Sequence, residues 1–160
     1  MVWAGFHASD RSDLVVMARD PRSKRGGYSS SSYIEVLEEQ LPNLCLGGKV
    51  FVQDNAPIHT ARWVMDWLAN NGYPLLKLPP YSPDLNPIEH AWFPLKEKVY
   101  LEYPQLRNLP QSKESTRDQF AQALEVEWTQ LEFSKVEGLI SSMKSRCQAV
   151  IDAKGWYTKY

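Results

Sequence analysis

Two acidic residues, Asp54 and Glu89, stand at places where a carboxylate can reach a ligand. Asp54 directly follows a short apolar strand pattern over 49–53, and Glu89 falls in the first turn of a helix expected to begin at Pro87. In open α/β sheets, ligands and catalytic groups gather where strands end. Carboxylate oxygens are ligands that Mg²⁺ prefers, usually one or two together with water and phosphate oxygens. The pair therefore indicates a divalent-metal site of the phosphoryl-transfer kind.

An ordinary structural role also accounts for these two residues, and helix caps are far more common than metal sites. Asn86, Pro87 and Glu89 fit the N-cap, first and third positions of a helix, so Glu89 can complete a capping arrangement. Asp54, followed by Asn55, can simply turn the chain toward its next helix. Spacing alone leaves both interpretations open.

The elements that must position these residues alternate between strands and helices. A strand over 1–6 and an apolar run over 14–17 suggest an antiparallel hairpin, and further strands are expected over 49–53 and 73–78. Helices are expected over 33–41, from Pro57 to a stop at 70–72, from Pro87 onward, over 116–131 and over 135–153. This order predicts a layered α/β domain.

Composition narrows the class of protein. The 160 residues carry 18 basic and 19 acidic side chains, a net charge of −1, which excludes a polybasic protein that holds nucleic acid by bulk charge. The longest apolar run, 14–18, is far too short for a membrane helix, and no secretory leader is visible. Cys45 and Cys147 make neither a disulfide framework nor a zinc-ligand spacing. We expect one intracellular domain over 1–160, with no membrane partner.

The amino-acid sequence around the two carboxylates indicates a protein family more specifically than their spacing does. The block from Gln53 to Ala61, QDNAPIHTA, resembles the second-aspartate block of the Tc/mariner group of DDE transposases. The block from Leu78 to Trp92, LPPYSPDLNPIEHAW, resembles the block that carries the catalytic glutamate of that family, and the 34 residues between Asp54 and Glu89 match the family spacing. The resemblance extends upstream to 1–5 and 26–37 and downstream to 141–151, which is nearly the whole chain.

The resemblance implies a ribonuclease-H-like α/β fold and a metal-dependent site that cleaves DNA and transfers strands. In the family, three carboxylates hold two Mg²⁺ (or Mn²⁺) ions, which activate the nucleophile and stabilise the leaving oxygen. Asp54 matches the second carboxylate and Glu89 the third, so both are predicted as catalytic residues and metal ligands. Asp84, in the same block, is interpreted as a turn residue beside Pro83.

Several further side chains could contact DNA in such a protein. The predicted nucleic-acid contacts are Asn55, His59, Lys96 and Lys98. His59 also offers a general base, but a role in shaping the loop is favoured because metal ions activate the nucleophile in two-metal sites. A basic loop is either a phosphate contact or a solvated charge run; its residues are Arg22, Lys24 and Arg25. Three tryptophans at helical spacing favour core packing over base stacking; they are Trp63, Trp67 and Trp92.

The chain departs from the family at its beginning. The first catalytic aspartate of the family lies on a central strand upstream of the block that 1–5 resembles, and the candidates Asp10, Asp13 and Asp20 lie outside the matching block. Without that strand, the hairpin must pair directly with the 49–53 strand or leave open edges that invite self-association. The helical DNA-recognition domains usual in the family are also not matched.

Three hypotheses follow. The first is a Tc/mariner-like DDE catalytic domain, N-terminally incomplete and, on its own, inactive because the first aspartate is missing. The second is a non-catalytic module that binds nucleic acid or protein, and the third is a truncated transposon remnant. DNA at transposon ends and targets is the expected partner, and the expected location is the nucleus in a eukaryote or otherwise the cytoplasm.

Overall fold

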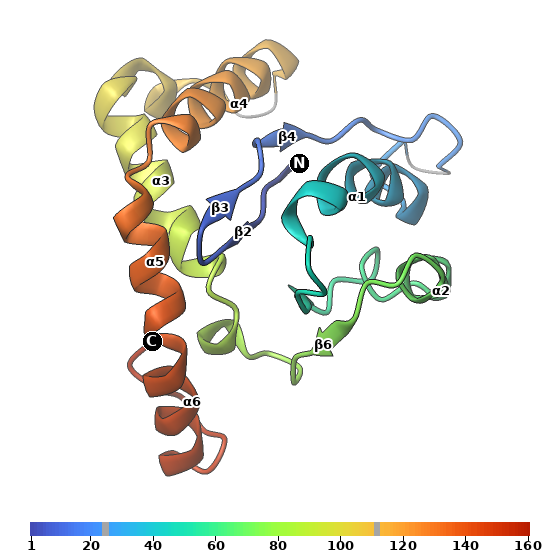
Figure 1. Cartoon of the computed structure of the whole chain (residues 1–160). Coiled ribbons are helices and arrows are strands. Elements are labelled where there is room, and N and C mark those ends of the chain that lie inside the picture. The colour runs from blue at the N-terminus through green and yellow to red at the C-terminus, as the bar shows by residue number, and fades with distance from the viewer. Residues whose placement is uncertain (24–25, 111–112) are drawn as a thin grey trace.

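The computed structural model of the chain describes residues 1–23, 26–110 and 113–160 (Figure 1). Lys24 and Arg25 of the predicted basic loop lie outside these residues. The helices are α1 (Ser30–Leu44), α2 (Arg62–Asn70), α3 (Glu89–Glu102), α4 (Glu114–Thr129), α5 (Phe133–Ser141) and α6 (Met143–Asp152), with short 3₁₀ turns at Pro83–Leu85 and Pro104–Asn108. None of the helices described is long and apolar enough to cross a bilayer.

The strands form three short pairs. β1 (Val2–Trp3) runs antiparallel to β4 (Val15–Val16), and β2 (Phe6–His7) runs antiparallel to β3 (Asp10–Arg11). β5 (Phe51–Gln53) runs parallel to β6 (Leu75–Lys77), and α2 makes the crossover between them. The predicted hairpin and both later strands are therefore present.

The predicted strand over 1–6 is interrupted between β1 and β2. Gly5 donates its backbone N–H to Ser12 Oγ at 2.8 Å, and its carbonyl accepts from the Ser12 N–H at 2.8 Å. A side chain thus replaces one rung of the ladder, and the hairpin bends there.

The hairpin does not pair with β5. Within the described residues, β1 has β4 as its only partner strand and β5 has only β6. Of the two outcomes expected for a sheet without its central strand, the structure has the one with open edges.

The prediction of a helix beginning at Pro57 is wrong, because α2 begins at Arg62. The Ala56 carbonyl accepts from the N–H groups of both His59 and Thr60, at 2.8 and 3.0 Å, so the chain makes a closed turn before the helix begins. The single helix predicted over 135–153 is also wrong. The segment is divided into α5 and α6 at Ser142, whose hydroxyl donates to the Leu139 carbonyl. Serine side chains commonly form such bonds in competition with the backbone hydrogen bonds of a helix.

Two clusters of buried side chains hold the elements together. The α1/α2 core contains Trp3, Met17, Tyr33, Ile34, Val36, Leu37, Leu41, Leu44, Val64 and Leu68. The α3/α4 core contains Ala4, Leu14, Ala91, Leu95, Val99, Leu106, Ala123, Leu124, Trp128, Leu131 and Val136. The β1–β4 hairpin contributes to both, because successive strand residues point to opposite faces.

Candidate active site

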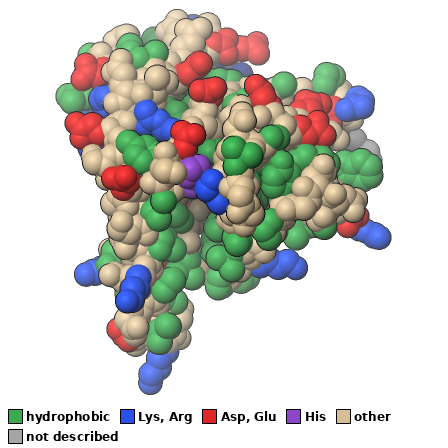
Figure 2. All heavy atoms as spheres, viewed as in Figure 1, with side chains coloured by type: hydrophobic (Ala, Val, Ile, Leu, Met, Phe, Trp, Pro, Cys, Tyr) green, Lys and Arg blue, Asp and Glu red, His purple; other side chains and the backbone are tan. Residues whose placement is uncertain are grey.

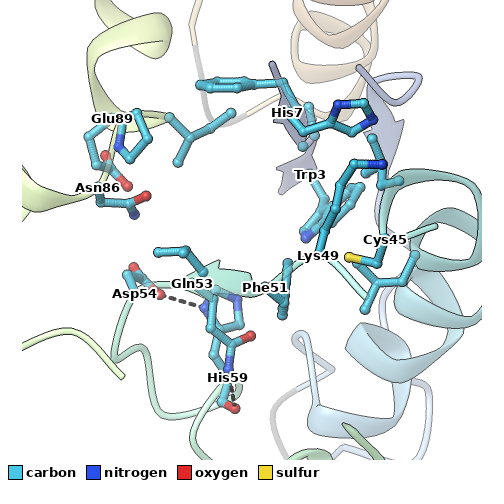
Figure 3. A pocket seen from close by; sticks show the side chains of 18 of the residues that line it. Trp3, His7, Cys45, Lys49, Phe51, Gln53, Asp54, His59, Asn86 and Glu89 are labelled. Atoms are coloured by element: carbon cyan, nitrogen blue, oxygen red, sulfur yellow. Dashed lines mark hydrogen bonds and ion pairs between the residues drawn. The ribbon is translucent and has the colours of Figure 1, made fainter. Parts of the chain in front are cut away.

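A pocket of about 670 Å³ lies between the two open strand edges (Figure 3). One wall is the segment 1–9, which carries β1 and β2, and the other is the segment 49–54, which carries β5. Side chains of α1 and the beginning of α3 complete the lining. The pocket thus borders both a strand end and a helix beginning.

Asp54 lies directly after β5, at the carboxyl end of that parallel strand. Its Oδ1 accepts from the Ala56 N–H at 3.1 Å and lies 2.5 Å from Nδ1 of His59. The side chain remains half exposed, at 49%. Asp54 therefore does turn the chain, as the structural interpretation expected, and still has a carboxylate oxygen available to a ligand.

His59 is held in place by a closed set of contacts. Its ring stacks on Tyr33 with 4.2 Å between ring centroids. The Tyr33 hydroxyl donates to Gln53 Oε1 at 2.7 Å, and Gln53 Nε2 donates to the His59 carbonyl at 3.1 Å. Burial raises the pKa of Tyr33, so its hydroxyl stays protonated and can donate. This network fixes the loop that carries Asp54.

Sequence reasoning missed Tyr33 and the role of Gln53. Twenty residues separate the two, and Tyr33 lies in the first turns of α1, where the pattern shows only one apolar residue among others. Gln53 does lie in the quoted motif, beside Asp54. A glutamine at the end of an apolar strand pattern is the one indication in the sequence that this side chain needs a hydrogen-bond partner.

Glu89 is the first residue of α3, and the capping interpretation does not describe it. The beginning of the helix has no side-chain cap; backbone bonds of the 3₁₀ type, such as Glu89 N–H to the Asn86 carbonyl at 3.2 Å, hold it instead. Although the residue as a whole is exposed, its carboxyl group is partly covered at the pocket wall. This burial raises the pKa of Glu89, the charge of Asp54 raises it further, and Lys96 partly offsets both.

The two carboxylates line the same side of the pocket. Figure 3 shows Asp54 and Glu89 there, with the buried Asn86 beside Glu89. Because they come from different elements and the charge of Asp54 disfavours ionisation of Glu89, a cation placed between them would be stabilised by both carboxylates.

These residues fit a divalent cation only in part. Two carboxylates are an adequate protein contribution for one hydrated Mg²⁺ or Mn²⁺. In the part of the chain that the structure describes, however, no group of three or more His, Cys, Asp or Glu side chains is arranged to hold a metal. Asp10, Asp13 and Asp20 do not line the pocket, and the Asp20 carboxylate accepts from Ser29 Oγ at 2.7 Å.

The predicted nucleic-acid contacts have different surroundings. Asn55 donates its side-chain amide to the carbonyls of Leu78 and Pro79, at 3.0 and 3.2 Å, and so ties the loops after β5 and β6 together. Lys98 pairs with the buried Glu127 at 2.6 Å, which raises the pKa of the lysine and joins α3 to α4. Lys96 is exposed near Glu89.

The remaining candidates divide between surface and core. Trp92 stacks on the buried Trp128, with 5.9 Å between ring centroids. The prediction of core packing is wrong for Trp63, which is 68% exposed. Trp67 donates to Glu38 Oε1 at 3.2 Å. Asp84 lies in the 3₁₀ turn after Ser82 and accepts from Thr158 Oγ1 at 2.5 Å, as befits a turn residue.

Comparison with known proteins decides the family. Residues 22–109 match the family model described as DDE superfamily endonuclease. This chain belongs to that family. The Tc1 transposase of Caenorhabditis elegans is 43% identical over 113 residues, which cover 71% of this chain and 38% of the relative. The Tcb1 transposase of Caenorhabditis briggsae is 42% identical over 111 residues, covering 69% and 37%.

These relatives place the DDE domain in the Tc/mariner group, as the motifs indicated, and the chain spans less than two fifths of their length. The crystal structure of the catalytic domain of Mos1 mariner transposase superposes with a TM-score of 0.62 at 17% identity, over 99% of this chain and 82% of that chain. The predicted ribonuclease-H-like α/β fold is thereby confirmed.

Proposed function

We propose that this DDE domain serves in metal-dependent DNA cleavage and strand transfer during DNA transposition, with Asp54 and Glu89 as catalytic residues and metal ligands. One observation carries the proposal. Two carboxylates from separate elements line one pocket, where burial and then the charge of Asp54 raise the pKa of Glu89. A cation between them relieves that repulsion.

The side chains have separable roles in this proposal. His59 bonds Oδ1 of Asp54 and so orients the carboxylate, which leaves Oδ2 for a cation. Glu89 supplies its carboxylate from the helix, where the backbone holds its position. A bound divalent cation would supply nucleophile activation and stabilisation of the leaving oxygen. The proposed ion is Mg²⁺ or Mn²⁺, since oxygen ligands suit both.

The chain by itself should bind the ion weakly and cut DNA slowly. Two-metal transfer needs ions held about 3.5–4 Å apart, and a further carboxylate would have to fix that spacing. The structure supports this expectation, because no third acidic side chain of the described residues lines the pocket. Poor alignment of the attacking and leaving oxygens would slow cleavage strongly, because positioning supplies roughly 7–11 kcal/mol of barrier reduction in well-organised sites.

DNA is the proposed partner, with Asn55, His59, Lys96 and Lys98 as its predicted contacts. On the one face that Figure 2 shows, basic side chains are scattered among acidic and apolar ones. Because the chain carries a net charge of −1, binding to DNA should be weak and salt-sensitive. Lys96 is the best placed of the four, because Lys98 and Asn55 already bond within the protein. The nucleus is the proposed location, and self-association stays a prediction.

A second candidate function is a non-catalytic, transposase-derived module that binds nucleic acid or protein. The observation that favours this function is that Asp54 and Glu89 are the two acidic side chains among the described residues that line the pocket. Two carboxylates can bind a cation, but they lack the third carboxylate of a two-metal catalytic site.

A nicking assay separates the two. Labelled duplex DNA is incubated with Mn²⁺ and the chain, beside Asp54→Ala and Glu89→Ala. Slow cutting that both substitutions abolish supports the catalytic proposal. Cutting that neither substitution changes would contradict it, and DNA binding without any cutting would favour the second candidate.

A further inference from the structure

Arg146 is a charged side chain that is buried in α6, outside the candidate active site. It is only 4% exposed, although arginine is seldom buried so completely without partners. Its Nε donates to Ser142 Oγ at 2.8 Å, and its guanidinium lies over the ring of Tyr160, 4.8 Å from the ring centroid. Burying a charge costs free energy unless its hydrogen bonds are made, so the remaining partner of this guanidinium shows what the residue holds.

That partner is Asp84, in the 3₁₀ turn before α3. Arg146 Nη1 donates to the Asp84 carbonyl at 3.4 Å, although 62 positions separate the two residues in sequence. Thr158, which follows α6, donates its hydroxyl to Asp84 Oδ2 at 2.5 Å and accepts from the Tyr160 N–H at 3.1 Å. The Asp84 cluster, defined as Asp84, Arg146, Thr158 and Tyr160, thus bonds both the carbonyl and the carboxylate of Asp84.

Short backbone bonds connect this turn to Glu89. Asp84 is the middle residue of the 3₁₀ turn Pro83–Leu85. The Asn86 N–H donates to the Pro83 carbonyl at 3.0 Å, and the Glu89 N–H donates to the Asn86 carbonyl at 3.2 Å. These bonds, rather than a side-chain cap, hold the beginning of α3. The position of Glu89 therefore depends on what holds Asp84.

The cluster also lies close to the first turn of α3. Burial lowers the pKa of His90, the residue after Glu89, and the positive charge of Arg146 lowers it further. Of the described residues, Asn86 and Glu89 line the pocket, whereas no member of the Asp84 cluster does. The cluster can therefore act on the site only through the turn and the helix that it holds.

We propose that Arg146 and Thr158 are positioning residues for Glu89. They hold the turn at Asp84 and thereby fix the Glu89 carboxylate in the pocket for a divalent cation. Groups that orient a metal ligand commonly change metal affinity 10–100-fold. The part of this proposal that concerns the cation rests on the proposed function, whereas the hold on the turn rests on the contacts alone.

The first measurement is hydrogen exchange followed by NMR, on the whole chain without metal. Arg146→Lys keeps the positive charge but loses the planar guanidinium, which bonds Ser142 and Asp84 at once. The amides of Asn86 and Glu89 should then exchange about tenfold faster, as the loss of hydrogen bonds from a charged group predicts.

Arg11→Lys is the matched control. Arg11 also donates from its guanidinium to two backbone carbonyls, those of Thr129 and Leu131, and it also lies over an aromatic ring, that of Trp128. Its contacts are to the end of α4 and the residues after it, so this variant should leave the exchange of the two amides as in the parent.

Thr158→Val and Thr158→Ser test the second contact to Asp84. Valine keeps the shape of threonine but has no hydroxyl, so the two amides should exchange about threefold faster. Serine keeps the hydroxyl and should behave like the parent. Thr158 is only partly buried and belongs to neither core, so this pair of variants decides the matter even where Arg146→Lys fails to fold.

The second measurement is Mn²⁺ affinity by electron paramagnetic resonance. Arg146→Lys should weaken binding about tenfold and Arg11→Lys should not. Unchanged amide exchange in the Arg146 and Thr158→Val variants, or an equal increase in Arg11→Lys, would overturn the proposal. Faster exchange with unchanged Mn²⁺ affinity would overturn the role toward Glu89. A parent chain that binds no Mn²⁺ would contradict the proposed function, while the exchange rates would still decide whether the cluster holds the turn.

Discussion

The two cores of the molecule differ in what surrounds them. The α3/α4 core is enclosed by α3, α4 and α5, and the hairpin is fastened to it by polar bonds: Trp128 Nε1 donates to the Ser12 carbonyl at 2.8 Å, and Arg11 donates to the carbonyls of Thr129 and Leu131. The α1/α2 core borders the pocket, because several of its buried members line that cavity.

This difference bears directly on the site, because each core carries one of the two carboxylates. Asp54 follows β5, which packs on the α1/α2 core, and Glu89 begins α3 in the other. The geometry of the pair therefore depends on how the hairpin joins the cores, with Trp3 and Ala4 buried on opposite sides. Both carboxylates line the pocket, but more of the buried side chains of the α1/α2 core than of the α3/α4 core border it.

The largest expected effect comes from removing one leucine from each core. Leu95→Ala and Leu37→Ala each delete a fully buried side chain, at a cost of about 2–5 kcal/mol. The cost depends on how well the surroundings collapse, so Leu95→Ala in the enclosed core should lie near the top of that range and Leu37→Ala near the bottom. Urea unfolding measures both; a larger loss for Leu37→Ala would contradict the contrast between the cores.

The next effect concerns the support of Asp54. His59→Ala removes the partner of Oδ1 and should weaken Mn²⁺ binding about tenfold, the usual cost of losing a group that orients a metal ligand. Arg62→Ala, at the first residue of α2, is a nearby control, since its contact is to Asp66 of the same helix. Isothermal titration measures the affinity. Unchanged affinity in His59→Ala would mean that the loop holds Asp54 without the histidine.

A smaller effect is expected for Tyr33→Phe, which removes the hydroxyl that donates to Gln53. The free energy of unfolding should fall by about 1 kcal/mol, because a buried acceptor loses its partner. Tyr100→Phe, beside Phe120 in the other half, is the matched control, and the described residues provide no partner for its hydroxyl. Equal changes in the two variants would contradict a specific role for the Tyr33–Gln53 bond.

The smallest effect is electrostatic. The pKa of Glu89 is raised in the folded chain, so folding disfavours its ionised form. The protonated carboxyl group therefore contributes to stability below its unfolded pKa, and this contribution is lost as pH rises through the folded pKa. In EDTA, Glu89→Gln should therefore raise the Tm at pH 7 by about 1 °C, a small shift because solvent screens an exposed group, and should leave it unchanged near pH 3. A lower Tm at pH 7 would contradict the repulsion from Asp54.

The sequence predicted the parts of the fold that depend on local pattern. Apolar patterns and the positions of prolines predicted the hairpin of 1–6 with 14–17, strands over 49–53 and 73–78, and a helix from Pro87. The structure has these elements with shorter strands, β5 and β6, and with α3 beginning two residues later, at Glu89. The resemblance of the motifs to the Tc/mariner family predicted the ribonuclease-H-like fold, which the superposition with the Mos1 catalytic domain confirms. The placement of Asp54 after a strand was predicted, and its role as a metal ligand stays a prediction.

What sequence pattern could not predict depends on side chains that compete with the backbone. Asp54 and the Ala56 carbonyl close a turn that delays α2 to Arg62, and the Ser142 hydroxyl divides the last helix. The partner of Gln53 is twenty residues away on α1. Such bonds are decided by tertiary packing, so periodicity carries no signal for them.

The central claim is that Asp54 and Glu89, one from each half of the molecule, hold one cation together. The most direct measurement is a Mn²⁺ titration followed by electron paramagnetic resonance, on the parent chain, Asp54→Asn, Glu89→Gln and the double variant. Shared ligation predicts that each single substitution removes most of the affinity and that the double variant is little worse than either, since contacting residues are not additive. Affinity retained in full by either single variant would contradict the claim.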